Sequence, residues 1–174
     1  MRNNLGFLVL WLVLMPVALG ITNAQEGSVG MKILSPEFEH NGFIPAKFTC
    51  QGEDISPALI IEGIPTAAKS LALIVDDPDA TTGTWVHWVV FDIGLIARIE
   101  ENSIPGKQGQ NDSGRNEYGG PCPPSGTHRY FFKIYALDKK LNLSEGITKQ
   151  ELEKAMAGHI LGQAELIGLY KKTR

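Results

Sequence analysis

The chain has 174 residues, of which 43% are hydrophobic and 20% are charged, and its formal net charge at pH 7 is −3. This composition fits one globular domain and leaves too little length for two. It also argues against a nucleic-acid-binding protein, because the sequence has no basic run and no interleaving of basic and aromatic residues.

The first 24 residues have the order of a secretory signal peptide. Arg2 gives a positive start, Leu5 to Leu19 is almost entirely apolar, and small residues follow up to Ala24. We expect cleavage after Ala24, with Gly20 as the second choice, and a secreted or periplasmic mature protein. An uncleaved membrane anchor is the alternative, although the apolar run is short for a span of about 20 residues.

Residues 25–30 read as a polar linker, and residues 31–174 as the domain. In its first half, strands are expected near 31–34 and 58–61, with turns and short strands between them and no helix. These short, proline-interrupted segments favour a β-rich fold.

Two longer strands flank an acidic turn. Residues 69–76 form a continuous apolar run, which predicts a strand buried on both faces. The run ends at Asp77-Pro78-Asp79, where a turn is expected. Residues 85–93 predict the next strand, and a side-chain period of two places His87 on one face with Trp85, Val89, Phe91 and Ile93.

A long polar stretch over residues 94–120 has no clear period, and such loops are usually functional or poorly ordered. It leads into a loop whose glycines and prolines, at positions 119–126, predict a rigid turn-rich segment. From His128 onward, aromatic and β-branched residues predict a strand. His128 and Tyr130 then share one face at its beginning.

The last part of the chain contains a helix signal. Thr148 and Glu151 have the spacing of a capping box, which predicts a helix start. We expect His159 to pack on the apolar face of this helix. Residues 164–170 either extend the helix or form a final strand. The residues that repeat at helical spacing are Leu152, Ala155, Met156, His159 and Ile160.

Cys50 and Cys122 are the two cysteines of the chain. In an oxidising compartment they could form one disulfide. The alternative is a pair of buried thiols, because free cysteine is among the most buried residue types. A zinc site is less favoured, since the spacing matches no CxxC pattern.

Polar groups are expected to gather where the central strands end. If these strands are neighbours, Asp77, His87, His128 and Tyr130 would line one concave site with the glycine-proline loop. Imidazolium and loop N–H groups suit an anion, and a carboxylate can orient a histidine and favour its charged form. The pattern predicts a pocket for phosphate or a similar group, with no cofactor and with binding that weakens as the histidines deprotonate. Taken individually, residues of these types more often have a turn, rim or packing role, and a metal site of two histidines and one or two aspartates is a minor alternative.

A hydrolase is a further alternative. Ser125 lies beside Gly126, but no G-x-S-x-G elbow is present. Cys122 with His128 and Asp77 would make a thiol site, although the three nearby prolines give Cys122 a structural character. We therefore expect no enzymatic activity.

Several short motifs occur in a specific order along the chain. They are DPDA at 77–80, GTWVHW at 83–88, YGGPCPP at 118–124, GTHRY at 126–130, ALD at 136–138, GHIL at 158–161 and LIGLY at 166–170. In this combination the chain resembles the phosphatidylethanolamine-binding protein family, and more closely its bacterial and archaeal Raf-kinase-inhibitor-like branch. The resemblance spans residues 31–172.

The resemblance implies a mainly β fold with peripheral helices, in which a large antiparallel sheet packs on a smaller one. It also implies an anion pocket, with polar residues from the strand ends, a loop wall, an aromatic wall, and Asp79 as support for the acidic turn. Loop amides near the glycine-proline segment would complete the cradle. The residues that correspond to ligand contacts are Asp77, His87, Gly120, Pro121, His128 and Tyr130.

Members of this family bind phosphate, acetate or phosphorylethanolamine-like head groups without being enzymes, and some inhibit serine proteases or kinases. The resemblance therefore implies a non-enzymatic binding protein for a small phosphate-like anion or a phospholipid head group. The alternative is inhibition of a protease or signalling kinase through the loop 115–118. Related microbial proteins suggest a homodimer. The loop 118–128 has the microbial form, and the C-terminal helix that partly closes the animal pocket is not evident.

Overall fold

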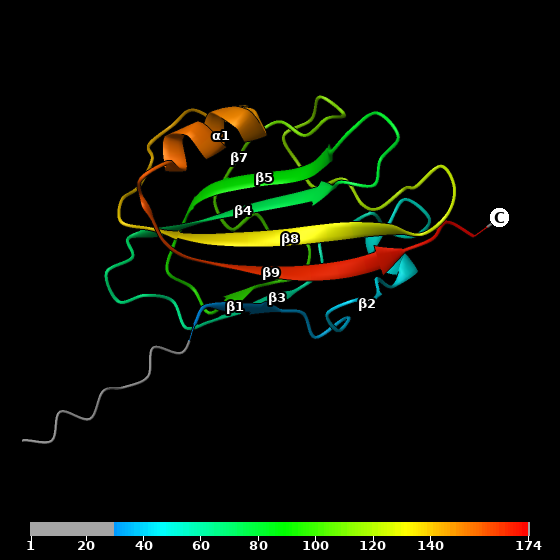
Figure 1. The fold of residues 1–174 in the computed structure, drawn as a ribbon, viewed down its shortest axis with the longest axis horizontal. Coiled ribbons are helices and arrows are strands. Elements are labelled where there is room, and N and C mark those ends of the chain that lie inside the picture. Colours follow the sequence, from blue (N-terminus) through cyan, green and yellow to red (C-terminus); the bar gives the residue numbers. More distant parts are fainter. Residues whose placement is uncertain (1–29, 174) are drawn as a thin grey trace, which may run out of the picture.

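The computed structural model describes residues 30–173. The predicted signal peptide and residues 25–29 of the predicted linker lie outside this range. Within it, the chain forms two β-sheets and one α-helix (Figure 1). No helix among the described residues is both long enough and apolar enough to cross a membrane.

The larger sheet has six strands in the order β2-β9-β8-β4-β5-β7. Its long strands pair antiparallel, whereas the short edge strand β2 runs parallel to β9. The strands are β2 (Gly42–Phe43), β4 (Ser70–Asp77), β5 (Trp85–Ile93), β7 (Lys107–Gln108), β8 (His128–Leu137) and β9 (Ile160–Tyr170).

The smaller sheet lies against one face of the larger sheet (Figure 1). Its strands are β1 (Lys32–Leu34), β3 (Leu59–Glu62) and β6 (Arg98–Ile99), in the order β1-β3-β6. Buried side chains from both sheets form one core cluster, including Leu59 and Ile61 from β3 and Phe132 and Ile134 from β8. The predicted fold, a large sheet packed on a smaller one with a peripheral helix, is confirmed.

The apolar run at 69–76 forms β4, which is buried along its whole length as predicted. It lies between β8 and β5, so hydrogen bonds occupy both of its edges. The long polar stretch after β5 contains only the short strands β6 and β7, and a short 3₁₀ helix, η1 (Ala46–Phe48), occurs in the half where no helix was expected. Sequence hydrophobicity therefore predicts the central strands of the sheet, but it does not predict the short elements.

The helix α1 (Lys149–Met156) covers the other face of the large sheet. The predicted capping box is present: the Glu151 amide donates to Thr148 Oγ1, and the Thr148 amide donates to Glu151 Oε2 at 2.8 Å. Leu152 and Met156 are buried in a second core cluster against the sheet.

The helix is shorter than the sequence pattern predicts. It ends at Met156, and Gly158 adopts a φ of +79°, which favours glycine and turns the chain back toward the sheet. His159 therefore does not pack on the helix, and its Nδ1 lies 2.9 Å from Asp138 Oδ1. Ile160 begins β9, which resolves the open alternative for residues 164–170 as a strand. The physical reason is long-range pairing, because β9 pairs with β8 along almost its full length.

Candidate functional site

A pocket of about 410 Å³ opens where β4 and β8 meet the beginning of β5 and the loop after β7. Five of the six predicted ligand contacts line it, namely Asp77, His87, Gly120, His128 and Tyr130. Pro121, the sixth, does not line the pocket. It is buried behind the wall, where its carbonyl accepts a hydrogen bond from the Cys50 amide at 3.2 Å.

A β-bulge in β5 directs His87 into the pocket. Val75 of β4 pairs with Trp88 and Asp76 pairs with Val86, so His87 is an extra residue without a partner in the register. Strict alternation would put His87 on the side of Val89 and Phe91, which pack in the second core cluster together with residues of α1. Instead its ring meets the Tyr130 ring edge to face, with centroids 5.2 Å apart. The predicted face of His87 is therefore wrong, because the bulge shifts the alternation by one residue.

His87 is fixed by the loop that follows β7. Its Nδ1 lies 2.6 Å from the Gly119 carbonyl oxygen, and since a carbonyl only accepts, Nδ1 carries the proton. His87 is 7% exposed. Burial lowers the pKa of His87, against the opposing effects of the Gly119 carbonyl and of the carboxylates of Asp77, Asp112 and Asp76.

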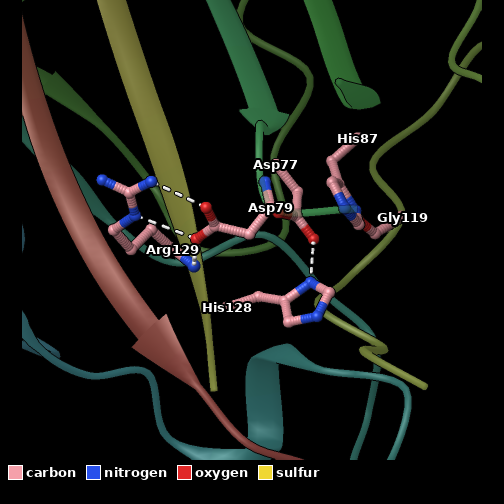
Figure 2. Close-up of polar contacts among 6 residues, drawn as sticks. All are labelled: Asp77, Asp79, His87, Gly119, His128 and Arg129. Atoms are coloured by element: carbon pink, nitrogen blue, oxygen red, sulfur yellow. Dashed lines mark hydrogen bonds and ion pairs between the residues drawn. The ribbon is translucent and has the colours of Figure 1, made fainter. Parts of the chain in front are cut away.

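His128 is fixed by Asp77. Its Nδ1 lies 2.7 Å from Asp77 Oδ2, and both side chains are almost fully buried. The other carboxylate oxygen of Asp77 accepts the Asp79 amide at 2.8 Å. Figure 2 shows the carboxylate of Asp77 directed at the His128 ring, so Asp77 orients His128 and not His87.

Asp79 lies outside the pocket and supports the turn, as predicted. Its carboxylate faces away from His128 and forms two hydrogen bonds with the Arg129 guanidinium, at 2.6 and 2.9 Å (Figure 2). It also accepts the Arg129 amide. These hydrogen bonds lower the pKa of Asp79 to about 2. The acidic turn is thereby held to the beginning of β8.

Tyr130 contributes more than an aromatic wall. The residue is 1% exposed. Among residues 30–173, its hydroxyl is the one buried side-chain polar atom without a hydrogen-bond partner. Burial raises the pKa of Tyr130, and the Asp77 carboxylate adds to this through its charge and its closeness to the hydroxyl, although the two do not have the geometry of a hydrogen bond; the hydroxyl therefore keeps its proton. Buried polar atoms are normally paired, which makes this hydroxyl a donor that awaits an acceptor.

The opposite wall is a loop tied down by covalent and polar contacts. Cys50 and Cys122 form a disulfide, which settles the alternative that the sequence left open. The Gly120 amide donates to Asp54 Oδ1 at 2.6 Å, and the Gly119 amide donates to the His87 carbonyl at 3.0 Å. Both amides are thus used within the protein, and the predicted cradle of loop amides at this position is wrong.

The structure also bears on the alternative functions. Cys122 has no free thiol to attack a substrate because it is bonded to Cys50. Within the part of the chain that the structure describes, no hydrogen bond joins Ser125 to a histidine, and Ser125 does not line the pocket. In the loop 115–118, residues 115–117 are exposed, whereas Tyr118 is buried and its hydroxyl donates to the Phe48 carbonyl at 2.9 Å. Among residues 30–173, no group of three or more His, Cys, Asp or Glu side chains could hold a metal ion.

Sequence reasoning missed several residues of the pocket. Asp54 lines it from the loop after η1, and Trp85, Asn111 and Arg115 also line it. The Arg115 guanidinium pairs with Glu117 at 2.9 Å. Trp85 was visible at the head of its strand, but Asp54, Asn111 and Arg115 are in irregular segments whose position depends on long-range contacts. No local signal could have found them.

The family model described as "Phosphatidylethanolamine-binding protein" matches residues 34–171. A UPF0098 protein of Methanothermobacter thermautotrophicus is 49% identical over 150 residues, which cover 82% of this chain and 99% of that protein. A UPF0098 protein of Pyrococcus abyssi is 47% identical and covers 95% of this chain and 98% of its own length.

Two solved structures have the same fold. The putative phosphatidylethanolamine-binding protein homolog CT736 from Chlamydia trachomatis gives a TM-score of 0.81 at 43% identity, covering 83% of this chain and 99% of its own. E. coli YbcL, described as a member of the mammalian PEBP family, gives 0.76 at 27% identity, covering 82% and 99%. The chain therefore belongs to the phosphatidylethanolamine-binding protein family.

Proposed function

We propose that this protein is a non-enzymatic binding protein whose pocket holds a small phosphate-like anion, either free or as part of a head group. The observation that carries the proposal is the buried Tyr130 hydroxyl without a partner, which lies in a pocket with two oriented histidines. A buried donor of this kind is stabilised by an acceptor from a ligand.

Each side chain has a distinct part in the proposed binding. Asp77 and the Gly119 carbonyl hold the Nδ1 atoms of His128 and His87, which leaves both Nε2 atoms for the ligand. The Tyr130 hydroxyl donates a hydrogen bond to an anion oxygen. The wall at Gly120 sets the shape of the site, because its amide is already bonded to Asp54.

We also propose that the protein is located outside the cytoplasm. It is supported by the signal-like order of residues 1–24 and by the Cys50–Cys122 disulfide, since disulfides persist in oxidising compartments. Detection of the processed chain in a periplasmic or culture-medium fraction tests it, and retention of the full-length chain in the cytosol would contradict it.

Calorimetric titration of the purified protein with phosphate and with phosphorylethanolamine at pH 6 tests the binding function. We expect saturable binding that is at least about tenfold weaker in His87→Ala and in His128→Ala, because each loses a contact to a charged ligand. His159→Ala is the matched control, since His159 lies outside the pocket. Absence of binding by the folded wild type, or equal binding by all variants, would refute the proposal.

A further inference from the structure

We infer that the Cys50–Cys122 disulfide is a thiol-exchange site, at which a small thiol attacks Cys50 and displaces Cys122. Its opening releases the part of the pocket wall that follows Cys122, so the thiol chemistry of the surroundings acts on the pocket. The exchange is independent of the proposed anion-binding function, whereas its effect on binding rests on that function.

The disulfide lies at the surface of the pocket. Cys50 and Cys122 are both exposed residues, and both line the pocket. The rate of thiol–disulfide exchange depends on access to the sulfur atoms as well as on the chemistry of the thiols, and a disulfide in the core of a domain is closed to a thiolate until the chain unfolds. We therefore expect this disulfide to react in the folded protein.

A lysine lies beside one of the two sulfur atoms. Lys172 Nζ is 3.7 Å from Cys122 Sγ, and among residues 30–173 it is the one charged group that hydrogen-bonds to either sulfur. A positive charge beside a sulfur atom stabilises its thiolate and makes it a better leaving group. Cys122 is therefore the sulfur that leaves, and Cys50 is the sulfur that is attacked.

The side chain of Gln51, the residue after Cys50, holds Lys172 in this position. The Tyr170 hydroxyl at the end of β9 donates to Gln51 Oε1 at 2.7 Å. The Thr173 amide donates to the same oxygen at 2.9 Å, and the Thr173 carbonyl accepts from Gln51 Nε2 at 2.7 Å. The chain after β9 is thereby tied to the loop after η1 (Figure 1), with Lys172 between the two tied residues.

The exchange proceeds in two displacements. The thiolate of the small thiol forms a new S–S bond with Cys50 Sγ, and the bond between Cys50 and Cys122 breaks. Cys122 Sγ keeps the electron pair of that bond and leaves as a thiolate paired with the Lys172 ammonium. A second small thiol then attacks the first one in the mixed disulfide and releases Cys50. Two small thiols are thus oxidised to one disulfide, the protein disulfide is reduced, and the two hydrogens pass through solvent to the two cysteines.

The disulfide anchors a segment of the wall that has few other ties. Before it, hydrogen bonds hold Gly119 and Gly120 in place. After it, no hydrogen bond joins residues 123–127 to the rest of the chain that the structure describes. Pro123 and Pro124 of this segment line the pocket. Reduction therefore loosens the wall at the two prolines and leaves the wall at Gly120 in place.

Glutathione, as the small thiol, tests the site of attack. The folded, oxidised protein is incubated with glutathione at pH 7.5, free thiols are blocked with N-ethylmaleimide at early times, and the modified peptides are identified by mass spectrometry. We expect glutathione on Cys50 and maleimide on Cys122. Glutathione found mainly on Cys122, or equally on both cysteines, would contradict the assigned direction.

The same reaction in urea shows whether the folded protein reacts. We expect a rate that stays nearly constant at urea concentrations below the unfolding transition. A rate that rises steeply there, in parallel with the population of unfolded chain, would overturn the inference, because the disulfide would then be open to attack only after unfolding.

Lys172→Met tests the part of the lysine. We expect exchange with glutathione to slow about three- to fivefold, and Lys172→Arg to keep the wild-type rate. The difference should shrink in about 1 M salt, which screens charges within about 3 Å. Lys171→Met is the matched control, because Lys171 is also exposed and does not hydrogen-bond to either sulfur. An unchanged rate in Lys172→Met would refute the part assigned to Lys172.

Proteolysis tests the release of the wall segment without any ligand. We expect proteinase K to cleave the segment 123–127 several-fold faster in the reduced protein, while cleavage in the exposed turn 81–84 serves as the internal control. Equal cleavage of the segment in both forms would show that packing, and not the disulfide, holds it.

Calorimetric titration with phosphate measures the effect on the pocket. We expect the reduced protein to bind several-fold more weakly than the oxidised protein, and Cys50→Ser/Cys122→Ser to bind like the reduced protein with or without dithiothreitol. Equal affinity of the two forms would refute the coupling of the disulfide to the pocket. If the oxidised protein binds no phosphate, the proposed function fails, whereas mass spectrometry and proteolysis still decide the exchange and the release.

Discussion

His87 and Gly119 are joined by two hydrogen bonds that run in opposite directions. The imidazole Nδ1 donates to the Gly119 carbonyl at 2.6 Å, and the Gly119 amide donates to the His87 carbonyl at 3.0 Å. The bulged part of β5 is thus connected to the loop wall by backbone and side chain together. The position of the wall and the orientation of the imidazole depend on each other, so a shift of the loop should disturb ligand binding.

The first prediction concerns the neighbouring glycine. A Cβ added at Gly120 would lie 2.6 Å from the Phe48 carbonyl oxygen and 2.7 Å from the Thr49 Cα, and neither backbone atom can move easily. We expect Gly120→Ala to lower the free energy of unfolding by about 1–3 kcal/mol and to weaken anion binding at least several-fold. Urea unfolding and calorimetry measure the two effects.

Gly119→Ala provides the control for this prediction. A Cβ at Gly119 would meet Asn111 Nδ2 at 3.5 Å, which is an ordinary contact, and the backbone there needs no positive φ. Its stability should stay within about 0.5 kcal/mol of the wild type. If the two variants behaved alike, the close packing of the loop at Gly120 would not be what holds the wall.

Features of the fold that depend on neighbouring residues were predicted from the sequence, whereas features that depend on long-range pairing were not. The apolar run of β4, the alternation of β8 and the capping box of α1 were predicted because each depends on a few neighbouring residues. The end of the helix was not, because His159 and Ile160 fit a helical repeat equally well. Pairing with β8 decided between the two structures.

The pocket follows the same division. Asp77, His87, His128 and Tyr130 were predicted to meet because they lie near strand ends, and the structure brings them together. The side of β5 on which His87 lies could not be predicted, because a bulge is a property of two paired strands. The contact between Gly120 and Asp54 joins residues 66 positions apart, and no local pattern indicates it.

The second prediction concerns the Cys50–Cys122 disulfide, which closes a loop with a sequence separation of 72 residues. Cross-linking a loop of this length restricts the unfolded chain, so we expect reduction with dithiothreitol to lower the free energy of unfolding by about 2–4 kcal/mol. Urea unfolding with and without the reductant measures the change. The double variant Cys50→Ser/Cys122→Ser should be as unstable as the reduced protein and should not respond to dithiothreitol. A response of the double variant would show that the reductant acts elsewhere.

The third prediction concerns the fully buried carboxylate of Asp76 at the end of β4. It forms ion pairs with two lysines, Lys133 of β8 at 2.8 Å and Lys149 of α1 at 2.5 Å. Loss of one lysine leaves the other to compensate, whereas loss of both leaves a buried charge unpaired. We therefore expect Lys133→Met/Lys149→Met to lose about 3–5 kcal/mol of stability, clearly more than the sum of the single variants.

A double-mutant cycle measured by urea unfolding checks this non-additivity. Lys154→Met is the control on the same helix, because Lys154 is exposed and should change stability by less than about 0.5 kcal/mol. Strict additivity of Lys133→Met and Lys149→Met would mean that the two lysines do not share the charge of Asp76.

The last prediction concerns the acidic turn and pH. The hydrogen bonds from Arg129 lower the pKa of Asp79 to about 2 in the folded protein, below its ordinary value of 3.8. The unfolded chain therefore binds a proton at Asp79 more readily, and the stabilisation is fully present above about pH 4 and is lost as the pH falls toward 2. Because Arg129 is half exposed, solvent screens the pair, and we expect Asp79→Asn to lower Tm by only about 2–4 °C at pH 7.

Thermal melts from pH 7 down to pH 2 should show the Tm values of the wild type and of Asp79→Asn converging at the acidic end. Arg129→Met should give the same profile, and Asp79→Asn/Arg129→Met should lose little more than either single variant. A difference between wild type and Asp79→Asn that stayed constant down to pH 2 would show that the charge of Asp79 is not what stabilises the turn.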